Sequence, residues 1–143
     1  MRRLGVFFLV LATVFALSSA ALAGGRPFST DLTGAAERPG PGDPDGSGHI
    51  SLTINPGQQE VCYDMHVAGV APILAAHIHV AGVDAPGPVV VDLMPVFDAD
   101  GDASTCVTGA RAVLVAIMAN PAGYYVNVHN ADFPDGALRG QLG

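Results

Sequence analysis

The sequence contains no lysine and no tryptophan, and its six basic residues, all arginine, face 13 acidic residues. The net charge of −7 has the wrong sign for binding a phosphate backbone, so nucleic acid is excluded as a partner. Without lysine, Schiff-base catalysis, a P-loop and a Ser-Lys dyad are excluded as well. The absence of tryptophan also argues against a sugar-binding surface built on aromatic stacking.

Charged residues are scarce in general, at 13% of the chain against 50% hydrophobic residues, and this excludes a disordered polymer and a coiled coil. Apolar residues recur at helical spacing over residues 108–120, before Pro121, and predict one short helix there. Elsewhere, glycine and proline punctuate short alternating or apolar segments, which predict strands at residues 28–32, 49–54, 60–67, 75–80, 89–94, 124–129 and 138–142. We therefore expect an all-β fold: a Greek-key-like β-sandwich or partly closed barrel of about seven or eight strands.

The first residues have the pattern of a secretory signal peptide. Arg2 and Arg3 precede an apolar run over residues 4–17, and Ala21-Leu22-Ala23 forms a small-x-small cleavage site. The run is too short to span a bilayer comfortably, and no longer apolar run follows it. We expect residues 1–23 to be removed and residues 24–143 to form a single secreted, extracellular domain without a transmembrane segment.

Only two cysteines are present, and both lie in the part expected to be exported. An oxidising compartment favours a disulfide between Cys62 and Cys106. Metal-binding thiolates or a reactive thiol are the alternative, but neither cysteine belongs to a C-x-x-C motif.

Most catalytic motifs are missing. Ser47 lies in G-S-G rather than in a G-x-S-x-G nucleophile elbow, and nothing in the sequence pairs Glu37 or Glu60, the only glutamates, with a second catalytic carboxylate. The chain carries no complete catalytic set, which favours a non-catalytic protein and leaves enzymatic activity open.

Histidine is the most informative residue type. His77 and His79 form H-I-H within a predicted strand, so their side chains project from one face about 7 Å apart, and His129 ends another predicted strand. Three imidazoles from neighbouring strands suit copper or zinc better than a hard cation. The alternative is a polar sheet face on which these histidines hydrogen-bond to the backbone and to Asp132 or Asn130.

Several ordered segments resemble a known family. LTGAAERP at residues 32–39 is followed by AHIHVAG at 76–82, GPVVVDL at 87–93, ANPAGYYVNVHN at 119–130 and FPDGALRGQL at 133–142. In this order they resemble the CHRD domain, named after repeats in chordin, over residues 28–142. The resemblance implies an extracellular β-rich domain, often alone after a signal peptide in bacteria, with no established enzymatic activity.

A weaker resemblance connects the histidines to the copper site of the copper-zinc superoxide dismutases. It would place copper ligands at His77, His79 and His129, with Arg139 nearby as an anion or substrate guide. The bridging histidine and the zinc ligands have no match in residues 81–88, and His66 is considered as a fourth ligand. An ion pair with a nearby carboxylate is the simpler role for Arg139.

Two hypotheses follow. In the first, the protein is a secreted, non-catalytic CHRD-type binding module whose partner is an extracellular protein or glycan. In the second, it is a metalloprotein that holds copper or zinc at the three histidines and uses the metal in redox or hydrolytic chemistry.

Overall fold

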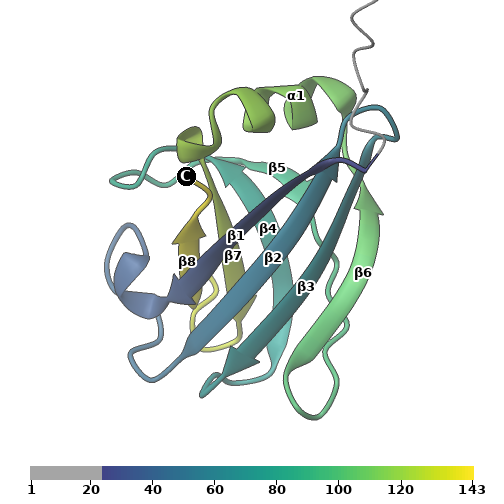
Figure 1. Cartoon of the computed structure of the whole chain (residues 1–143). Helices are drawn as coiled ribbons and strands as arrows, with labels where there is room; N and C mark the ends of the chain where they lie inside the picture. Colours follow the sequence, from purple (N-terminus) through teal and green to yellow (C-terminus); the bar gives the residue numbers. More distant parts are fainter. Residues whose placement is uncertain (1–23) are drawn as a thin grey trace, which may run out of the picture.

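A computed structural model of the chain describes residues 24–143, so the predicted signal peptide, residues 1–23, lies outside the described residues. Eight antiparallel strands form one sheet with the order β5-β4-β7-β8-β1-β2-β3-β6, and this sheet curls into a nearly closed barrel (Figure 1). The strands are β1 (Arg26–Thr33), β2 (Ser47–Asn55), β3 (Glu60–Ala68), β4 (Ile73–Val80), β5 (Val89–Asp92), β6 (Asp102–Thr108), β7 (Tyr124–Asn130) and β8 (Leu138–Gln141). The predicted all-β class is confirmed, and the fold is a barrel with one short α-helix.

Alternation of apolar and polar residues explains which side of each strand faces the core. In β3, Val61, Tyr63 and Met65 are buried in the barrel interior, while Asp64 and His66 between and beyond them are exposed. The same alternation places Ile78 of β4 in the core and leaves its neighbours on the opposite face of the sheet. We call the face turned away from the core the outer face.

The sheet consists of two halves that are joined by few backbone contacts. β1, β2, β3 and β6 pair along most of their length and form what we call the β2–β3 half. β5, β4, β7 and β8 form the β4–β7 half. Between the halves, β1 and β8 share the single register pair Thr33 and Arg139. Each half therefore has its own outer face.

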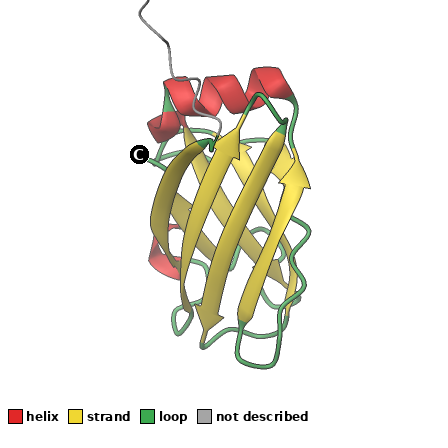
Figure 2. Ribbon diagram, turned by 45° about the vertical axis from the view of Figure 1, so that its right-hand side comes forward, coloured by secondary structure: helices red, strands yellow, loops and turns green. Residues whose placement is uncertain are grey.

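The helix α1 (Arg111–Ala119) lies across one end of the barrel (Figure 2) and buries Leu114 and Ile117. It is shorter than the predicted 108–120 segment, because residues 102–108 form β6, a strand that the sequence analysis did not predict. β6 buries only Ala103. It therefore lacks the alternating apolar pattern by which strands are recognised, and its position is set by pairing with β3. Two short 3-10 turns, Gly34–Ala36 and Pro121–Gly123, complete the regular structure.

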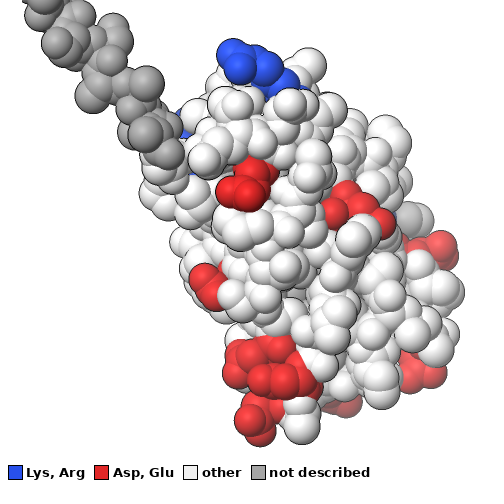
Figure 3. All heavy atoms as spheres, turned by 90° about the vertical axis from the view of Figure 1, so that its right-hand side faces the viewer, with Lys and Arg blue, Asp and Glu red and all other residues white. Residues whose placement is uncertain are grey.

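The surface carries its acidic side chains unevenly. On the face drawn in Figure 3 they gather at the end of the barrel opposite α1. Among residues 24–143, no helix is long and apolar enough to cross a membrane.

Candidate metal centre

The three histidines predicted as ligands lie together on the outer face of the β4–β7 half. His77 and His79 come from β4 and His129 from β7, the next strand in the sheet. Their ring centroids are 5.1–5.9 Å apart. One nitrogen from each ring can be chosen so that all three atoms lie within 4.8 Å of one another. The register is diagonal: His77 lies opposite Asn127, and His129 lies two residues further along β7.

Backbone carbonyls determine which nitrogen of two of these rings carries the proton. His79 Nδ1 lies 2.8 Å from the carbonyl oxygen of Gly87, and His129 Nδ1 lies 3.0 Å from that of Pro134. Since a carbonyl oxygen can only accept, both Nδ1 atoms must donate a hydrogen. In the neutral rings, each Nε2 is then left with a lone pair, the form that binds a metal ion.

Three of the four remaining ring nitrogens have no hydrogen-bond partner. His77 Nδ1, His79 Nε2 and His129 Nε2 are buried and unpaired among the described residues. A buried polar atom without a partner costs about 1–3 kcal/mol, so three such atoms in one cluster need an explanation. The sequence analysis offered a fully hydrogen-bonded polar face as the alternative. In this cluster only the Nδ1 atoms of His79 and His129 are hydrogen-bonded in that way. A bound cation would satisfy all three unpaired nitrogens.

Burial keeps two of the rings neutral. Removal from water lowers the pKa of His79, and the neighbouring rings His129 and His77 lower it further, against the opposing effect of the hydrogen bond to Gly87. Burial likewise lowers the pKa of His129, with the bond to Pro134 opposing it. Both rings are therefore in the ligand form over a wider pH range than a free imidazole.

The loop between β4 and β5, residues 81–88, covers one side of the cluster and is held by Arg139. This arginine is only 1% exposed. It donates to the carbonyl oxygens of Ala85 at 3.0 Å and of Gly82 at 2.8 Å. Gln141, two residues further along β8, donates to the carbonyl oxygen of Ala81 at 2.8 Å. No ion pair of Arg139 occurs within residues 24–143; its contacts anchor the loop.

Tyr125 links this anchor to the cluster. Its ring stacks on His79, with centroids 4.9 Å apart and planes 11° apart, and Arg139 Cζ lies 3.5 Å from its centroid. Its hydroxyl accepts a hydrogen bond from the Gly87 N–H at 3.1 Å. Gly87 must be glycine, because a Cβ there would lie 1.9 Å from the carbonyl oxygen of Val80. Tyr125 and the loop together fix the orientation of His79.

Glu37 is a buried carboxyl near the same face and was not predicted to belong to it. The Asn127 side chain donates to Glu37 and also to the carbonyl oxygen of Leu138. Burial raises the pKa of Glu37 to about 7, although Asn127 and Arg139 oppose the rise. Gly136 permits this approach, since a Cβ there would lie 2.5 Å from Glu37 Oε2. No local sequence signal could have found this contact, because 90 residues separate Glu37 from Asn127.

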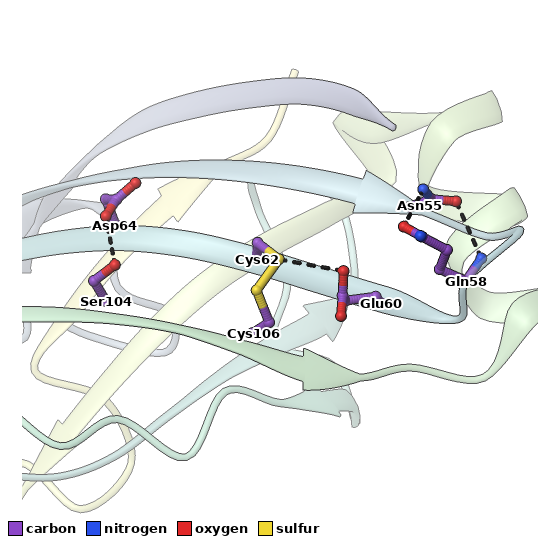
Figure 4. Close-up of a disulfide and its surroundings, with 7 residues drawn as sticks. All are labelled: Asn55, Gln58, Glu60, Cys62, Asp64, Ser104 and Cys106. Atoms are coloured by element: carbon purple, nitrogen blue, oxygen red, sulfur yellow. Dashed lines mark hydrogen bonds between the residues drawn. A yellow bond between two sulfur atoms is a disulfide. The ribbon is translucent and has the colours of Figure 1, made fainter. Parts of the chain in front are cut away.

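The predicted disulfide is present on the other half of the sheet. Cys62 and Cys106 are directly opposed on β3 and β6, with Cα atoms 3.9 Å apart and an S–S bond (Figure 4). Glu60 lies beside them, 3.4 Å from Cys62 Sγ. This group offers no thiolate to a metal, because the two sulfurs are bonded to each other.

His66 is not the fourth ligand that the sequence analysis considered. It lies on β3, on the β2–β3 half, where its Nδ1 contacts Asp102 Oδ1 at 2.8 Å. The cluster therefore has three protein nitrogens, all from the β4–β7 half.

Comparison with protein families identifies the class of the chain. The model of the CHRD domain matches residues 28–142. This range includes all eight strands, apart from the first two residues of β1, and all three clustered histidines. The chain belongs to the CHRD domain family. Comparisons with curated proteins and with solved structures found no significant match.

Proposed function

We propose that this protein is a secreted CHRD-domain protein that binds copper or zinc at His77, His79 and His129. The observation that carries the proposal is a cluster of three histidines whose ring nitrogens come within 4.8 Å of one another, in which each ring has one buried nitrogen without a hydrogen-bond partner among the described residues. Supporting it, backbone carbonyls orient two of the rings from behind, the arrangement commonly found around metal-binding histidines. The pattern of the N-terminal residues supports secretion.

The donor set favours late first-row metals. Three neutral imidazoles suit Cu²⁺ and Zn²⁺, and a site of this kind generally binds Cu²⁺ more tightly than Zn²⁺. Three protein ligands leave a coordination position for water or a small molecule, as in catalytic rather than closed structural zinc sites. A bound metal would supply Lewis-acid chemistry or, for copper, one-electron chemistry. The chain's own part is to orient the rings and to keep His79 and His129 neutral by burial.

Metal analysis of protein purified without chelator tests the proposal. We expect one equivalent of copper or zinc at this site, lost in His77→Ala and in His129→Ala. Tyr124→Phe is a control on the same strand, since Tyr124 packs against the core. Purified wild-type protein that takes up neither metal at this site would contradict the proposal.

Binding of an extracellular protein or glycan is a second candidate function, independent of metal. A groove of about 580 Å³ runs over β1, β2, β3 and β6 and includes Ser51, Asp64 and Ser104 among its lining residues. Its hydroxyls and carboxylate offer hydrogen bonds to a partner, and Pro27 and Phe28 add apolar surface. Glycan and protein arrays probed with the secreted protein test this function, and Ser51→Arg, which would fill the groove, should abolish any binding found.

A further inference from the structure

A second group of histidines lies on the outer face of the β2–β3 half. His49 of β2 and His66 of β3 are directly opposed in the strand register. Asp31 of β1 lies opposite His49 on its other side, and Asp102 of β6 lies opposite His66. The four residues form an uninterrupted row, Asp31, His49, His66 and Asp102, across four neighbouring strands. We call it the Asp-His-His-Asp row.

Each histidine of the row is hydrogen-bonded to the aspartate beside it through Nδ1. His49 Nδ1 lies 2.7 Å from Asp31 Oδ1, and His66 Nδ1 lies 2.8 Å from Asp102 Oδ1. An ionised carboxylate can only accept, so each Nδ1 carries a hydrogen and each neutral ring keeps its lone pair on Nε2. Carboxylates often hold metal-binding histidines in this way.

The direction of these contacts leaves both Nε2 atoms free of the aspartates. The two nitrogens of an imidazole ring lie on different edges of the ring. Each Nδ1 faces its flanking strand, β1 for His49 and β6 for His66, so each Nε2 is turned away from that strand's aspartate. Directly opposed residues of antiparallel strands have Cβ atoms about 4.5–5.5 Å apart, close enough for two imidazoles to share one ion.

We propose that His49 and His66 form a second site for a late first-row divalent cation, Cu²⁺ or Zn²⁺, with water completing the coordination. The side chains of both histidines are about half exposed, at 52% and 53%, so the site is open to the solvent. A surface hollow of about 300 Å³ beside the two rings gives room for the ion and its water ligands. Asp64 also lines this hollow, and its Oδ1 accepts a hydrogen bond from Ser104 Oγ at 2.6 Å.

This site is independent of the three-histidine cluster, because it uses different residues on the other half of the sheet. Metal binding at the second site is therefore measured in a protein whose three-histidine cluster has been removed by mutation. Cu²⁺ and Zn²⁺ are titrated calorimetrically into His77→Ala/His129→Ala protein, and into the same protein with His66→Ala added. We expect one equivalent to bind in the first and none in the second. His49→Ala should have the same effect as His66→Ala.

The flanking aspartates give a sharper test. Asp31→Asn or Asp102→Asn keeps an acceptor for Nδ1 but removes the charge, and should weaken metal binding by about tenfold. Ser29→Ala is the matched control. Ser29 lies two residues before Asp31 on β1 and therefore on the same outer face, but it is not part of the row, so binding should be unchanged.

Measurement in the otherwise native protein keeps the inference testable if the double variant does not fold. Wild type should then bind one equivalent more of Cu²⁺ or Zn²⁺ than His66→Ala, whose substitution lies on the exposed face. Two results would show that the row is only a solvated polar surface. One is equal stoichiometry in wild type and His66→Ala. The other is unchanged metal binding when His66→Ala is added to His77→Ala/His129→Ala. Either result would overturn the inference.

Discussion

The two histidine groups occupy equivalent positions on one sheet, its outer face, yet they differ in nearly every physical property. On the β4–β7 half, the loop anchored by Arg139 covers the face, and backbone carbonyls bind the Nδ1 atoms of His79 and His129. On the β2–β3 half no segment of residues 24–143 covers His49 and His66 in this way, and carboxylates take the place of the carbonyls.

The difference shows that cover, more than residue type, decides what a histidine on a sheet can do. Under the loop, unpaired ring nitrogens are costly and burial keeps His79 and His129 neutral, so a metal ion would be held by prearranged ligands. In the open, water pairs with the same nitrogens at no cost, and any cation must displace it. The covered cluster should therefore contribute far more to both binding and stability than the open row.

The largest effect on stability is expected from removing the disulfide bond on the β2–β3 half, the half that no loop covers. The Cys62–Cys106 disulfide joins residues 44 apart in the sequence. On the chain-entropy model, closing a loop of this length stabilises the fold by about 4 kcal/mol. Denaturant unfolding with and without reductant should show a loss of about this size. Cys62→Ala/Cys106→Ala should be insensitive to reductant; an equal response to reductant in both proteins would refute the assignment.

The next largest effect should come from removing the anchor on the β4–β7 half. Arg139→Met keeps much of the side-chain volume but leaves the carbonyl oxygens of Gly82 and Ala85 without their donor. We expect a loss of about 3 kcal/mol in the free energy of unfolding, because hydrogen bonds from a charged group contribute about 1.5–3 kcal/mol each and water can recover part of them. Arg26→Met, at an exposed arginine, is the control. A loss below that of the control would show that Arg139 does not hold the loop.

The sequence predicted those features that depend on local pattern. Period-two alternation gave the faces of β3, and H-I-H together with the strand-end position of His129 gave the convergence of the cluster. The disulfide followed from the expected oxidising compartment and the lack of other cysteines. These inferences needed only the pattern within single strands, or a count.

Contacts between distant segments could not be predicted where no distinctive residue type marked both partners. β6 has too few apolar residues to be recognised, and only its pairing with β3 makes it a strand. Arg139 binds a carbonyl 57 residues away, and nothing near either residue encodes that contact. The opposition of His49 and His66 depends on the register of β2 and β3, which a single sequence constrains only through the turn between them.

Glu37 allows the covered face to be examined by pH. Its pKa is raised to about 7, so the folded protein holds a proton that the unfolded chain releases near pH 4.5. This stabilisation is complete below pH 4.5 and is lost as the pH rises through 7, a change of up to about 3 kcal/mol. We expect the free energy of unfolding of wild type to fall relative to that of Glu37→Gln as the pH rises from 4.5 to above 7, because glutamine has no proton to lose. A difference for Glu37→Gln that stays flat over this range would contradict the raised pKa.

His79 and His129 act on stability with the opposite sign. Their pKa values are lowered, so their contribution is complete above the unfolded value near 6.5 and is lost as the pH falls toward the folded values. Comparison of wild type with Glu37→Gln, rather than of wild type at two pH values, separates the two effects.

Metal binding should add a somewhat smaller stabilisation to the covered half. At a hundredfold excess of Cu²⁺ or Zn²⁺ over the dissociation constant, the gain is about 2.7 kcal/mol. Coordination needs neutral rings, so the gain should vanish as acid protonates them, and the lowered pKa values of His79 and His129 extend it toward lower pH. Thermal melts at pH 7.5, 6.5 and 5 measure it, with His77→Ala as the comparison and Ca²⁺ as the control ion. A melting temperature unmoved by Cu²⁺ or Zn²⁺ at pH 7.5 would remove the metal centre.

The smallest effect is expected in the open row when metal is absent. Asp31 is 85% exposed and His49 52% exposed in their side chains, so water and salt screen their interaction. Exposed pairs of this kind contribute about 0–1 kcal/mol, and Asp31→Asn retains a hydrogen-bond acceptor for His49 Nδ1. We expect the free energy of unfolding to change by less than about 0.5 kcal/mol. Asn127→Ala is the counterpart on the covered half, where the amide is 2% exposed and donates to Glu37 and to the Leu138 carbonyl oxygen. If Asp31→Asn destabilised the protein as much as Asn127→Ala does, cover would not be what separates the two halves.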